Sequence, residues 1–470
     1  MLILLILSKI SVPSVSKNVA IVGAGITGLT AAFRLHEQGC QVTVLERATQ
    51  PGGSIRSIAD HGYLIEAGPN SLQYGAPELK QLVHDLGLEP ELVLANPSAK
   101  RRFIVRGGRF VAVPSSPPSL IGSSLFGART KLSLLTELFT RPRVRTTDLS
   151  LAELVRSHFT QELLDYAVNP LIAGIYAGDP EKLSVRHAFP ALWQAERSSG
   201  SLIRGMIAGM KAKKAAGGSG VAPIVSFRRG LQTLTDALAA RLPAGSLKLG
   251  VTVETLLPGR PHRLVWKQDG QSASGEFDAV VLAVPAGALA QLTLGTLGER
   301  PLASLDNIPH PPVASLFLGY RREQVTHPLD GFGGLVPAVE KRDVLGILFS
   351  STLFPHRAPA GHVGLTIFAG GSRQPDHARL TAEGLLAKID RDLRDLVGAK
   401  GPPAFMRHSV WPRAIPQYVP GYERWLEQLT ALETAHAGLF IGGNARDGIS
   451  LPDCVKSGGR LAKIALEYGK

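Results

Sequence analysis

Apolar positions at the start of the chain form short continuous runs separated by a stretch with helical spacing. Residues 19–22 are a β-branched run that predicts a buried parallel strand. Residues 26–38 place apolar side chains on one side of a predicted helix, and Gly39 ends it. Residues 41–45 predict a second buried strand. The chain therefore opens with a predicted strand–helix–strand unit.

The middle of the chain changes to a helical pattern. Residues 114–214 carry amphipathic stretches, and a polar glycine-rich loop at 211–220 is predicted to close them. One stretch combines apolar with basic side chains: Leu132, Leu134, Leu135, Leu138 and Phe139, flanked by Arg129, Lys131 and Arg141. A helix with two such faces lies in a membrane interface or packs against neighbouring helices, and the pattern leaves both open.

Strand patterns return in the second half of the chain. A helix is predicted to begin at residue 227, and the apolar run at 277–284 predicts a parallel core strand. A hairpin is predicted at 102–113, and strands at 312–318, 331–337, 344–350 and 362–369 predict a mostly antiparallel sheet. Residues 438–455 have the pattern strand, glycine turn and helix, which returns the end of the chain to the first domain.

Three glycines follow the first predicted strand at the spacing of a dinucleotide-binding turn. Gly23 permits the tight turn, Gly25 lets the backbone approach a pyrophosphate, and Gly28 lets the helix pack on the strand. The start of that helix offers free N–H groups to phosphates. Glu46 stands where an acidic side chain accepts hydrogen bonds from a ribose diol. This motif alone leaves NAD and FAD both open.

Two further glycine-rich turns favour FAD. Gly52 and Gly53 allow the backbone to press on a cofactor just after the acidic strand end, and Arg56 is placed to pair with a phosphate. Residues 62–71 predict a strand that ends in a tight turn, which we expect beside a flavin ring. Such a second cluster is typical of FAD-binding, amine-oxidase-like flavoproteins.

Charge and cysteine content narrow the class of protein. The net charge is +13, and ten basic residues stand against the one acid Glu137 between residues 100 and 145. Such a basic region suits an anionic membrane surface, an acidic ligand or plain solvation, and no nucleic-acid-binding motif accompanies it. The two cysteines, Cys40 and Cys454, provide no disulfide framework and are expected to be packing residues. No run of apolar residues is long enough to span a bilayer.

Several segments together resemble the oxygen-dependent protoporphyrinogen oxidases, a family of FAD-dependent, amine-oxidase-like flavoproteins. The resemblance extends from residue 18 to 470 and is most specific at Ala-Gly-Ile-Tyr-Ala-Gly-Asp-Pro (173–180) and Ile-Pro-Gln-Tyr (415–418). It implies oxidation of protoporphyrinogen IX to protoporphyrin IX by hydride transfer to FAD N5, with O2 as acceptor and H2O2 as product. FAD is expected to be non-covalent, because no cysteine lies between residues 406 and 422.

The resemblance also implies site residues. The expected cofactor-binding residues are Gly23, Ala24, Gly25, Ile26, Thr27, Gly28, Glu46, Arg47, Gly53, Ser54, Arg56, Gly68, Pro69, Asn70, Ser71, Val253, Trp411, Gly443, Ile449, Ser450 and Leu451. The expected substrate-binding residues are Arg102 for a propionate, Leu335, Leu348 and Phe368 around the macrocycle, and Gly174 and Asn70. No side chain is assigned a certain catalytic role, and no metal site is expected.

The pattern and the resemblance together predict a fold of mixed α/β and α+β class. A Rossmann-type FAD-binding domain takes residues 17–100, 221–290 and 438–470, and a mixed-sheet substrate domain takes 101–113 and 291–437. A helical membrane-binding domain takes 114–220.

Alternatives stay open at this stage. The substrate could be coproporphyrinogen III, and the fold also carries amine oxidases, carotenoid desaturases and non-catalytic flavoproteins. We expect a cytoplasmic protein that binds peripherally to the anionic inner face of the cytoplasmic membrane. The resemblance leaves room for a homodimer, and no nucleic acid is expected as a partner.

Overall fold

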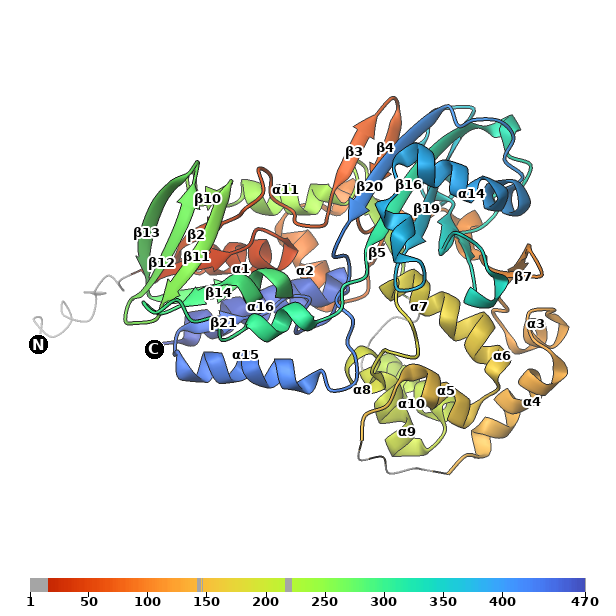
Figure 1. The fold of residues 1–470 in the computed structure, drawn as a ribbon, viewed down its shortest axis with the longest axis horizontal. Coiled ribbons are helices and arrows are strands. Elements are labelled where there is room, and N and C mark those ends of the chain that lie inside the picture. Colours follow the sequence, from red (N-terminus) through yellow and green to blue (C-terminus); the bar gives the residue numbers. More distant parts are fainter. Residues whose placement is uncertain (1–15, 142–144, 146, 216–221, 470) are drawn as a thin grey trace, which may run out of the picture. The chain divides into compact units, whose positions relative to one another are not determined.

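The computed structural model describes residues 16–141, 145, 147–215 and 222–469, and these form two units (Figure 1). The first unit comprises the described parts of residues 1–53, 234–306 and 425–470. The second unit comprises the described parts of 54–233 and 307–424. The three-domain division expected from the sequence stays a prediction, since the helical segment falls within the second unit.

A parallel sheet forms the centre of the first unit. Its strand order is β10 (Leu247–Lys248), β2 (Gln41–Leu45), β1 (Asn18–Val22), β14 (Ala279–Leu282) and β21 (Leu439–Ile441), and all four pairings are parallel. The sheet confirms the strands predicted at 19–22 and 41–45 and the core strand within 277–284. The residues of β14 are fully buried, which explains their continuous apolar run.

Helices α1 (Ile26–Glu37) and α16 (Leu451–Glu467) lie side by side in this unit (Figure 1). Their close approach depends on Gly458, where a Cβ atom would lie 2.5 Å from the carbonyl oxygen of Thr27. The unit also holds α12 (Ala286–Gln291), most of α11 (Gln232–Ala240) and of α15 (Glu423–Ala435), and a second sheet. That sheet contains β11 (Val251–Leu257), β12 (His262–Gln268), β13 (Gln271–Phe277) and β15 (Thr293–Leu294).

A seven-stranded mixed sheet forms the core of the second unit. Its strand order is β20 (Phe405–Trp411), β16 (Val313–Arg321), β19 (His362–Gly370), β18 (Gly346–Leu348), β17 (Gly333–Leu335), β7 (Arg102–Arg106) and β8 (Arg109–Ala112). Only the β17–β7 pair is parallel, so the predicted mostly antiparallel sheet and the hairpin at 102–113 are confirmed. One face of the sheet packs on α14 (Ala382–Val397) through side chains such as Ile347, Leu365 and Leu393.

Shorter elements complete the second unit. They are β3 (Ser57–Asp60), β4 (Tyr63–Glu66), β5 (Leu72–Gln73), β6 (Leu92–Leu94), β9 (Ile224–Phe227), α2 (Pro77–Asp85) and α13 (Ser350–Leu353). The helical segment comprises α3 (Pro117–Gly122), α4 (Ala128–Thr136), α5 (Leu151–His158), α6 (Gln161–Leu163), α7 (Asn169–Tyr176), α8 (Val185–Ala188), α9 (Pro190–Ser199) and α10 (Leu202–Ala215). A π-helical turn, Leu164–Val168, directly precedes α7.

Two predicted element boundaries are wrong. Phe227 ends a strand rather than starting a helix, because Gly230 makes a turn at φ +86° before α11 begins at Gln232. Residues 211–215 belong to α10 rather than to a loop, since lysine and alanine are good helix formers. The rest of that predicted loop lies outside the described residues.

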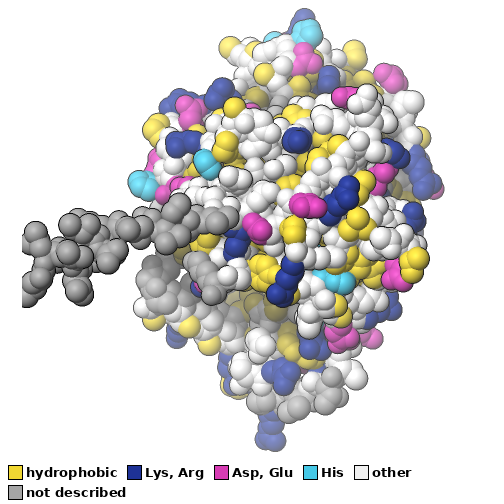
Figure 2. Space-filling view, turned by 90° about the vertical axis from the view of Figure 1, so that its left-hand side faces the viewer, with side chains coloured by type: hydrophobic (Ala, Val, Ile, Leu, Met, Phe, Trp, Pro, Cys, Tyr) yellow, Lys and Arg dark blue, Asp and Glu magenta, His cyan; other side chains and the backbone are white. Residues whose placement is uncertain are grey.

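Both cysteines are buried, as expected for packing residues. Neither Cys40 nor Cys454 forms a disulfide. On the face shown in Figure 2, Lys and Arg side chains are scattered among acidic and apolar ones. Within the described part of the chain, no helix combines the length and the apolar character needed to cross a membrane.

The contact at Gly458 can be tested with its neighbour as a control. Gly458→Ala should lower the free energy of unfolding by about 1–3 kcal/mol, since its Cβ would overlap the Thr27 carbonyl. Gly459→Ala meets no atom within 4 Å and should raise stability by up to about 1 kcal/mol, the helix propensity difference. Guanidinium unfolding of both variants gives the comparison, and equal effects would contradict the contact.

Candidate functional site

The glycine turn between β1 and α1 is shaped by two contacts that exclude side chains. Gly23 has φ +102°, and a Cβ there would lie 2.6 Å from the carbonyl oxygen of Ala283. A Cβ on Gly28 would lie 1.9 Å from the carbonyl oxygen of Gly23. These two glycines therefore serve the turn and the packing of the helix on the strand.

Gly25 differs from its neighbours because its Cβ position faces open space, with nothing within 4 Å. It is the N-cap of α1, and the first turn of this helix contains no acidic side chain. Ala24 accepts a hydrogen bond from the N–H of Gly52 at 2.8 Å, which brings the second glycine pair beside the turn. The uncovered N–H groups of a helix start suit a pyrophosphate, so the residues present fit a dinucleotide.

Glu46 stands at the end of β2, beside the glycine turn. Its carboxylate accepts hydrogen bonds from the backbone N–H groups of Ala24 at 2.7 Å and Ala48 at 2.8 Å, one on each oxygen. Each oxygen keeps a further lone pair for a ribose hydroxyl. The N–H of Val251 bonds the Glu46 carbonyl at 2.8 Å, which places the start of β11, and Val253 on it, beside this strand end. Arg47 is exposed.

The turn before α16 is organised by a carboxylate that the sequence did not single out. Asp447 accepts hydrogen bonds from the N–H of Gly443 at 3.2 Å, the hydroxyl of Ser457 at 2.5 Å and the guanidinium of Arg460 at 2.9 Å. Gly443 has φ +103°, and Ser450 caps α16 by accepting from the N–H of Asp453. The expected residues Ile449, Ser450 and Leu451 thus share one helix start in the first unit.

The second unit gathers another set of the expected cofactor residues in a single turn after β4. A Cβ on Gly68 would lie 1.9 Å from the carbonyl oxygen of Ser54, and the indole N–H of Trp411 bonds the carbonyl of Ala67 at 2.7 Å. The N–H of Ala67 bonds the carbonyl of Arg56 at 2.9 Å. Pro69 and Ser71 lie in the same turn, half-buried.

Asn70 in this turn has an unsatisfied polar atom. Its amide donates to the carbonyl of Gly68 at 3.0 Å, while its buried Oδ1 has no hydrogen-bond partner among the described residues. A buried acceptor without a partner is costly in a folded protein and calls for a missing donor. The turn therefore fits a bound group that supplies one.

A buried ion pair between Glu66 and Arg357 precedes this turn and was not predicted from the sequence. Glu66, at the end of β4, accepts hydrogen bonds from the hydroxyl of Ser57 at 2.6 Å, the N–H of Leu231 at 2.9 Å and the guanidinium of Arg357 at 3.1 Å. Burial raises the pKa of Glu66 to about 7, although the positive charge of Arg357 acts to lower that pKa. Burial also lowers the pKa of Arg357 to about 10. The pair joins segments far apart in the sequence, so no local pattern reveals it.

The sheet register brings four expected substrate residues to one face. Leu335, Gly346 and Phe368 are opposite one another across β17, β18 and β19. Arg102, Gly333 and Leu348 form the adjacent row, two residues along. Because residues opposite each other or two apart share a face, Arg102, Leu335, Leu348 and Phe368 project from the same side. Glycines separate the large side chains within each row.

Helix α7 covers this face at Leu335. A Cβ on Gly174 would lie 2.8 Å from Leu335 Cδ2, so the leucine side chain rests against the glycine. Phe368 packs with Ala173 and Ala177 at the two ends of the same helical turn. Arg102 is exposed, its guanidinium lies 5.3 Å from the centroid of the Phe332 ring, and no carboxylate of a described residue pairs with it. All the expected substrate residues except Asn70 thus lie together.

The two most specific sequence segments contact each other. Gln417 is buried and donates from its amide to the carbonyl of Tyr176 at 2.9 Å. The N–H of Ser184 bonds the carbonyl of Tyr418 at 2.7 Å. The segment 415–418 therefore supports the end of α7 rather than forming a separate site.

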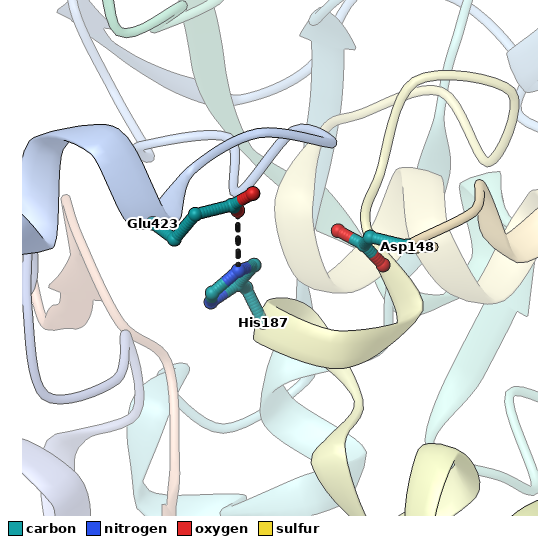
Figure 3. Close-up of side chains that lie close together, drawn as sticks. All are labelled: Asp148, His187 and Glu423. Atoms are coloured by element: carbon teal, nitrogen blue, oxygen red, sulfur yellow. Dashed lines mark hydrogen bonds and ion pairs between the residues drawn. The ribbon is translucent and has the colours of Figure 1, made fainter. Parts of the chain in front are cut away.

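One histidine and two carboxylates, Asp148, His187 and Glu423, place their ligand atoms within 4.8 Å of one another (Figure 3). His187 Nε2 bonds Glu423 at 3.1 Å. Asp148 accepts from the Ser184 hydroxyl at 2.5 Å and from the N–H groups of Leu149 and Arg186. These bonds tie α8 to the starts of α5 and α15, and they give each group a structural role.

The chain is similar to known proteins along almost its whole length. The pattern of the family "Flavin containing amine oxidoreductase" matches residues 26–466. The chain is 33% identical to protoporphyrinogen oxidase 2, chloroplastic/mitochondrial, of Arabidopsis thaliana, over 96% of this chain and 94% of that protein. It is 27% identical to coproporphyrinogen III oxidase of Bacillus subtilis (strain 168), over 96% of this chain and 98% of that protein.

Solved structures share the fold along almost the whole chain. An Exiguobacterium sp. 255-15 protein provisionally described as a protoporphyrinogen oxidase superposes with a TM-score of 0.80 at 25% identity, covering 96% of this chain and 99% of its own. Reduced UDP-galactopyranose mutase superposes with a TM-score of 0.73 at 16% identity, covering 96% of both chains. The second likeness shows a common fold alone.

The open space at Gly25 allows a test that separates folding from cofactor binding. Gly25→Val should fold close to wild-type stability, because its Cβ position has no protein atom within 4 Å, and should purify without flavin, because the side chain would occupy the proposed pyrophosphate position. Flavin absorbance and circular dichroism measure the two properties. A folded Gly25→Val protein that retained its yellow colour would refute the placement.

Proposed function

We propose that this chain, which belongs to the flavin-containing amine oxidoreductases and within them to the protoporphyrinogen oxidases, oxidises a porphyrinogen to its porphyrin. It is an FAD-dependent oxidoreductase. Protoporphyrinogen IX is the substrate we favour, since identity is higher to the plant protoporphyrinogen oxidase than to the bacterial coproporphyrinogen III oxidase. Coproporphyrinogen III is the second candidate.

One observation supports the substrate class above all others. Leu335, Leu348 and Phe368 share a sheet face with the unpaired cation Arg102. A porphyrinogen is a wide apolar ring with carboxylates on its rim, so it needs an apolar wall and a cation at the edge. The planar guanidinium of arginine binds a carboxylate through two parallel hydrogen bonds.

The residues of both glycine turns are assigned to the cofactor in this proposal. In the first unit, the start of α1 is assigned to the pyrophosphate and Glu46 to the ribose. In the second unit, the turn at 68–71 is assigned to the flavin, with Asn70 Oδ1, which has no hydrogen-bond partner among the described residues, as an acceptor. When bound, FAD would supply a hydride acceptor at N5, with O2 as the proposed final acceptor and H2O2 as its product. The protein contributes binding and orientation, with Arg102 fixing the substrate by its propionate.

Arg102 provides a test of the substrate site. Arg102→Ala should raise KM for the porphyrinogen roughly ten- to hundredfold with full flavin content, because a charge-assisted hydrogen bond is worth about 1.5–3 kcal/mol. Porphyrin fluorescence with protoporphyrinogen IX and coproporphyrinogen III as substrates measures the rates. Arg101→Ala is the matched control, since Arg101 is exposed and paired with Asp330.

Three outcomes separate the alternatives. An unchanged KM in Arg102→Ala would remove that residue from the propionate site. Anaerobic bleaching of the flavin by an amine, and not by a porphyrinogen, would assign an amine oxidase. Flavin that no porphyrinogen bleaches or turns over would indicate a non-catalytic flavoprotein.

We also propose that the helical segment docks on an anionic membrane surface. Several large apolar side chains of this segment are exposed: Ile121, Leu132, Leu135 and Phe139 near α3 and α4, and Met206, Ile207 and Met210 on α10. Arg129 and Arg141 are exposed beside the first group. Apolar side chains enter the headgroup boundary while arginines attract anionic lipid. The homodimer that the resemblance leaves open stays a prediction.

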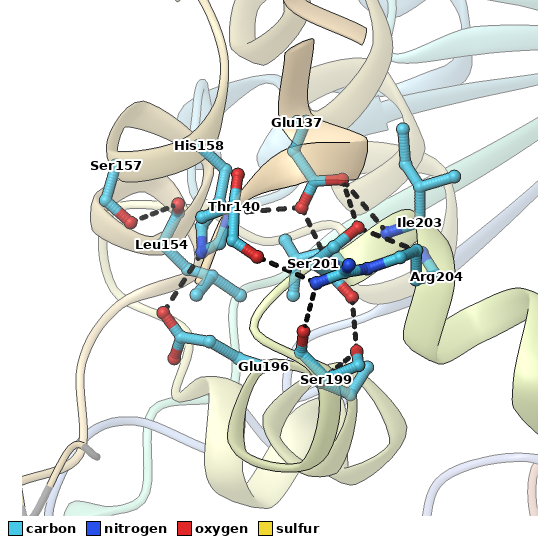
Figure 4. A network of polar contacts seen from close by, with 12 residues as sticks. Glu137, Thr140, Leu154, Ser157, His158, Glu196, Ser199, Ser201, Ile203 and Arg204 are labelled. Carbon is cyan, nitrogen blue, oxygen red and sulfur yellow. Dashed lines mark hydrogen bonds and ion pairs between the residues drawn. The ribbon is translucent and has the colours of Figure 1, made fainter. Parts of the chain in front are cut away.

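A buried polar network fixes the helices that carry these side chains (Figure 4). Glu137 accepts from the hydroxyl of Ser201 at 2.7 Å and from the N–H of Leu202 at 2.5 Å, which caps the start of α10. The His158 ring lies between Glu137 at 3.1 Å and Glu196 at 3.0 Å, and all three side chains are fully buried. The end of α4 and the start of α10 are thereby held together.

Vesicle co-sedimentation tests the membrane proposal. The protein should bind vesicles that contain anionic phosphatidylglycerol, and binding should weaken as salt screens the charges. Replacing both Leu135 and Phe139 by serine should release it, whereas Leu297→Ser, which alters a side chain 88% exposed in the first unit, should not. Wild-type protein that stays in the supernatant at low salt would refute docking.

A further inference from the structure

Arg373 joins three of the segments that carry proposed substrate residues of the second unit: β19, β17 and α7. It follows β19, five residues after Phe368. Its guanidinium donates to the carbonyl of Val336 at 2.8 Å and to Oδ1 of Asn169 at 3.0 Å. Val336 directly follows Leu335 at the end of β17, and Asn169 is the first residue of α7.

The link between α7 and β17 is reinforced by a second bond. Oδ1 of Asn169 also accepts a hydrogen bond from the N–H of Ala338 at 2.9 Å. The N–H of Val336 in turn bonds the carbonyl of Leu345, and the N–H of Leu345 bonds the carbonyl of Phe368. The start of α7 is thus tied directly to the strands that carry Leu335 and Phe368.

The loop that contains Arg373 holds both ends of α7. The N–H of Ser372 bonds the carbonyl of Ala177, the C-cap of α7, at 2.8 Å, while Arg373 bonds Asn169 at its start. The π-helical turn before Asn169 interrupts regular α-helical hydrogen bonding there. These tertiary bonds therefore hold α7 at both of its ends.

We propose that Arg373 and Asn169 are positioning residues that set the spacing between α7 and β17, and with it which porphyrinogen fits against Leu335. The inference rests on the proposed function, because it concerns the same substrate face. Gly174 and Leu335 are already in contact, with 2.8 Å between a Cβ position and a side-chain methyl. A small shift of α7 therefore changes the space beside Leu335 without any contact between Arg373 and the substrate.

The chemistry of the link requires an arginine. The guanidinium reaches two acceptors on different segments at once, whereas the ammonium of lysine is a point donor on a flexible stem. Burial lowers the pKa of Arg373 to about 10, so the group stays charged at neutral pH. A lysine in its place keeps the charge and loses the bridge.

The experiment compares variants of the flavin-loaded protein. Because the lost bond lies within the protein and its loss shifts α7 against Leu335, Arg373→Lys and Asn169→Leu should each raise KM for protoporphyrinogen IX about tenfold, with kcat and flavin content near wild type. Asn169→Asp keeps the acceptor and should stay near wild-type KM. Arg379→Lys is the control, because its pair with Asp376 is fully on the surface.

Two readouts distinguish positioning from plain structural support. The ratio of kcat/KM for protoporphyrinogen IX over coproporphyrinogen III should change in Arg373→Lys and in Asn169→Leu. The double variant should raise KM no more than either single variant does. Equal losses for both porphyrinogens that follow a fall in melting temperature would overturn the proposal.

The proposal fails separately from the function it rests on. If the wild type oxidises a porphyrinogen and Arg373→Lys keeps its KM and its selectivity, only the positioning role is refuted. If the wild type neither oxidises porphyrinogens nor binds protoporphyrin IX in a fluorescence titration, the proposed function falls and the positioning role with it. If Arg373→Lys is obtained in low yield, Asn169→Leu tests the same bond from its other partner.

Discussion

The hydrogen-bond register between β17, β18 and β19 determines what the second unit presents to a ligand. It places Leu335, Gly346 and Phe368 in one row and Leu348 in the next, on the same face. A slip of one residue in any of these strands would turn its side chain into the core shared with α14, because the side-chain period of a strand is two. The glycines in the rows matter as much as the large residues, because a glycine without a side chain separates the large side chains on either side of it.

Helix α7 packs against this sheet face and limits the space beside Leu335. Its Gly174 accepts the side chain of Leu335, and the contact leaves no room for even a methyl group on the glycine. Support for the helix comes from three directions: Gln417 at Tyr176, Ser372 at Ala177 and Arg373 at Asn169. Polar residues around the helix thus fix the apolar contact between Gly174 and Leu335.

A charged side chain in each unit is hydrogen-bonded beside a turn that contains glycine. Asp447, which is half-buried, accepts from the N–H of Gly443 in the turn before α16, and Glu66, which is buried, ends the strand before the turn at 68–71. A buried charge is costly unless it is paired and hydrogen-bonded, and removing its partner destabilises a protein strongly. The presence of Asp447 and Glu66 beside these turns ties the stability of each unit to the geometry of its proposed cofactor residues.

The sequence by itself determined the parallel sheet of the first unit, the glycine turn, Glu46 at its strand end and six of the seven strands of the mixed sheet in the second unit, all but β20. These features follow from periodicity and local steric rules, which act over a few neighbouring residues. The grouping of Arg102, Leu335, Leu348 and Phe368 came from family resemblance, because spacing along the chain does not reveal which strands pair. Only the tertiary structure revealed the Glu66–Arg357 pair, Asp447 and the Arg373–Asn169 bond, and the true start of α11. Each of these features depends on contacts between residues distant in sequence, or on a turn that such contacts stabilise. The periodicity of the sequence does not reveal such contacts.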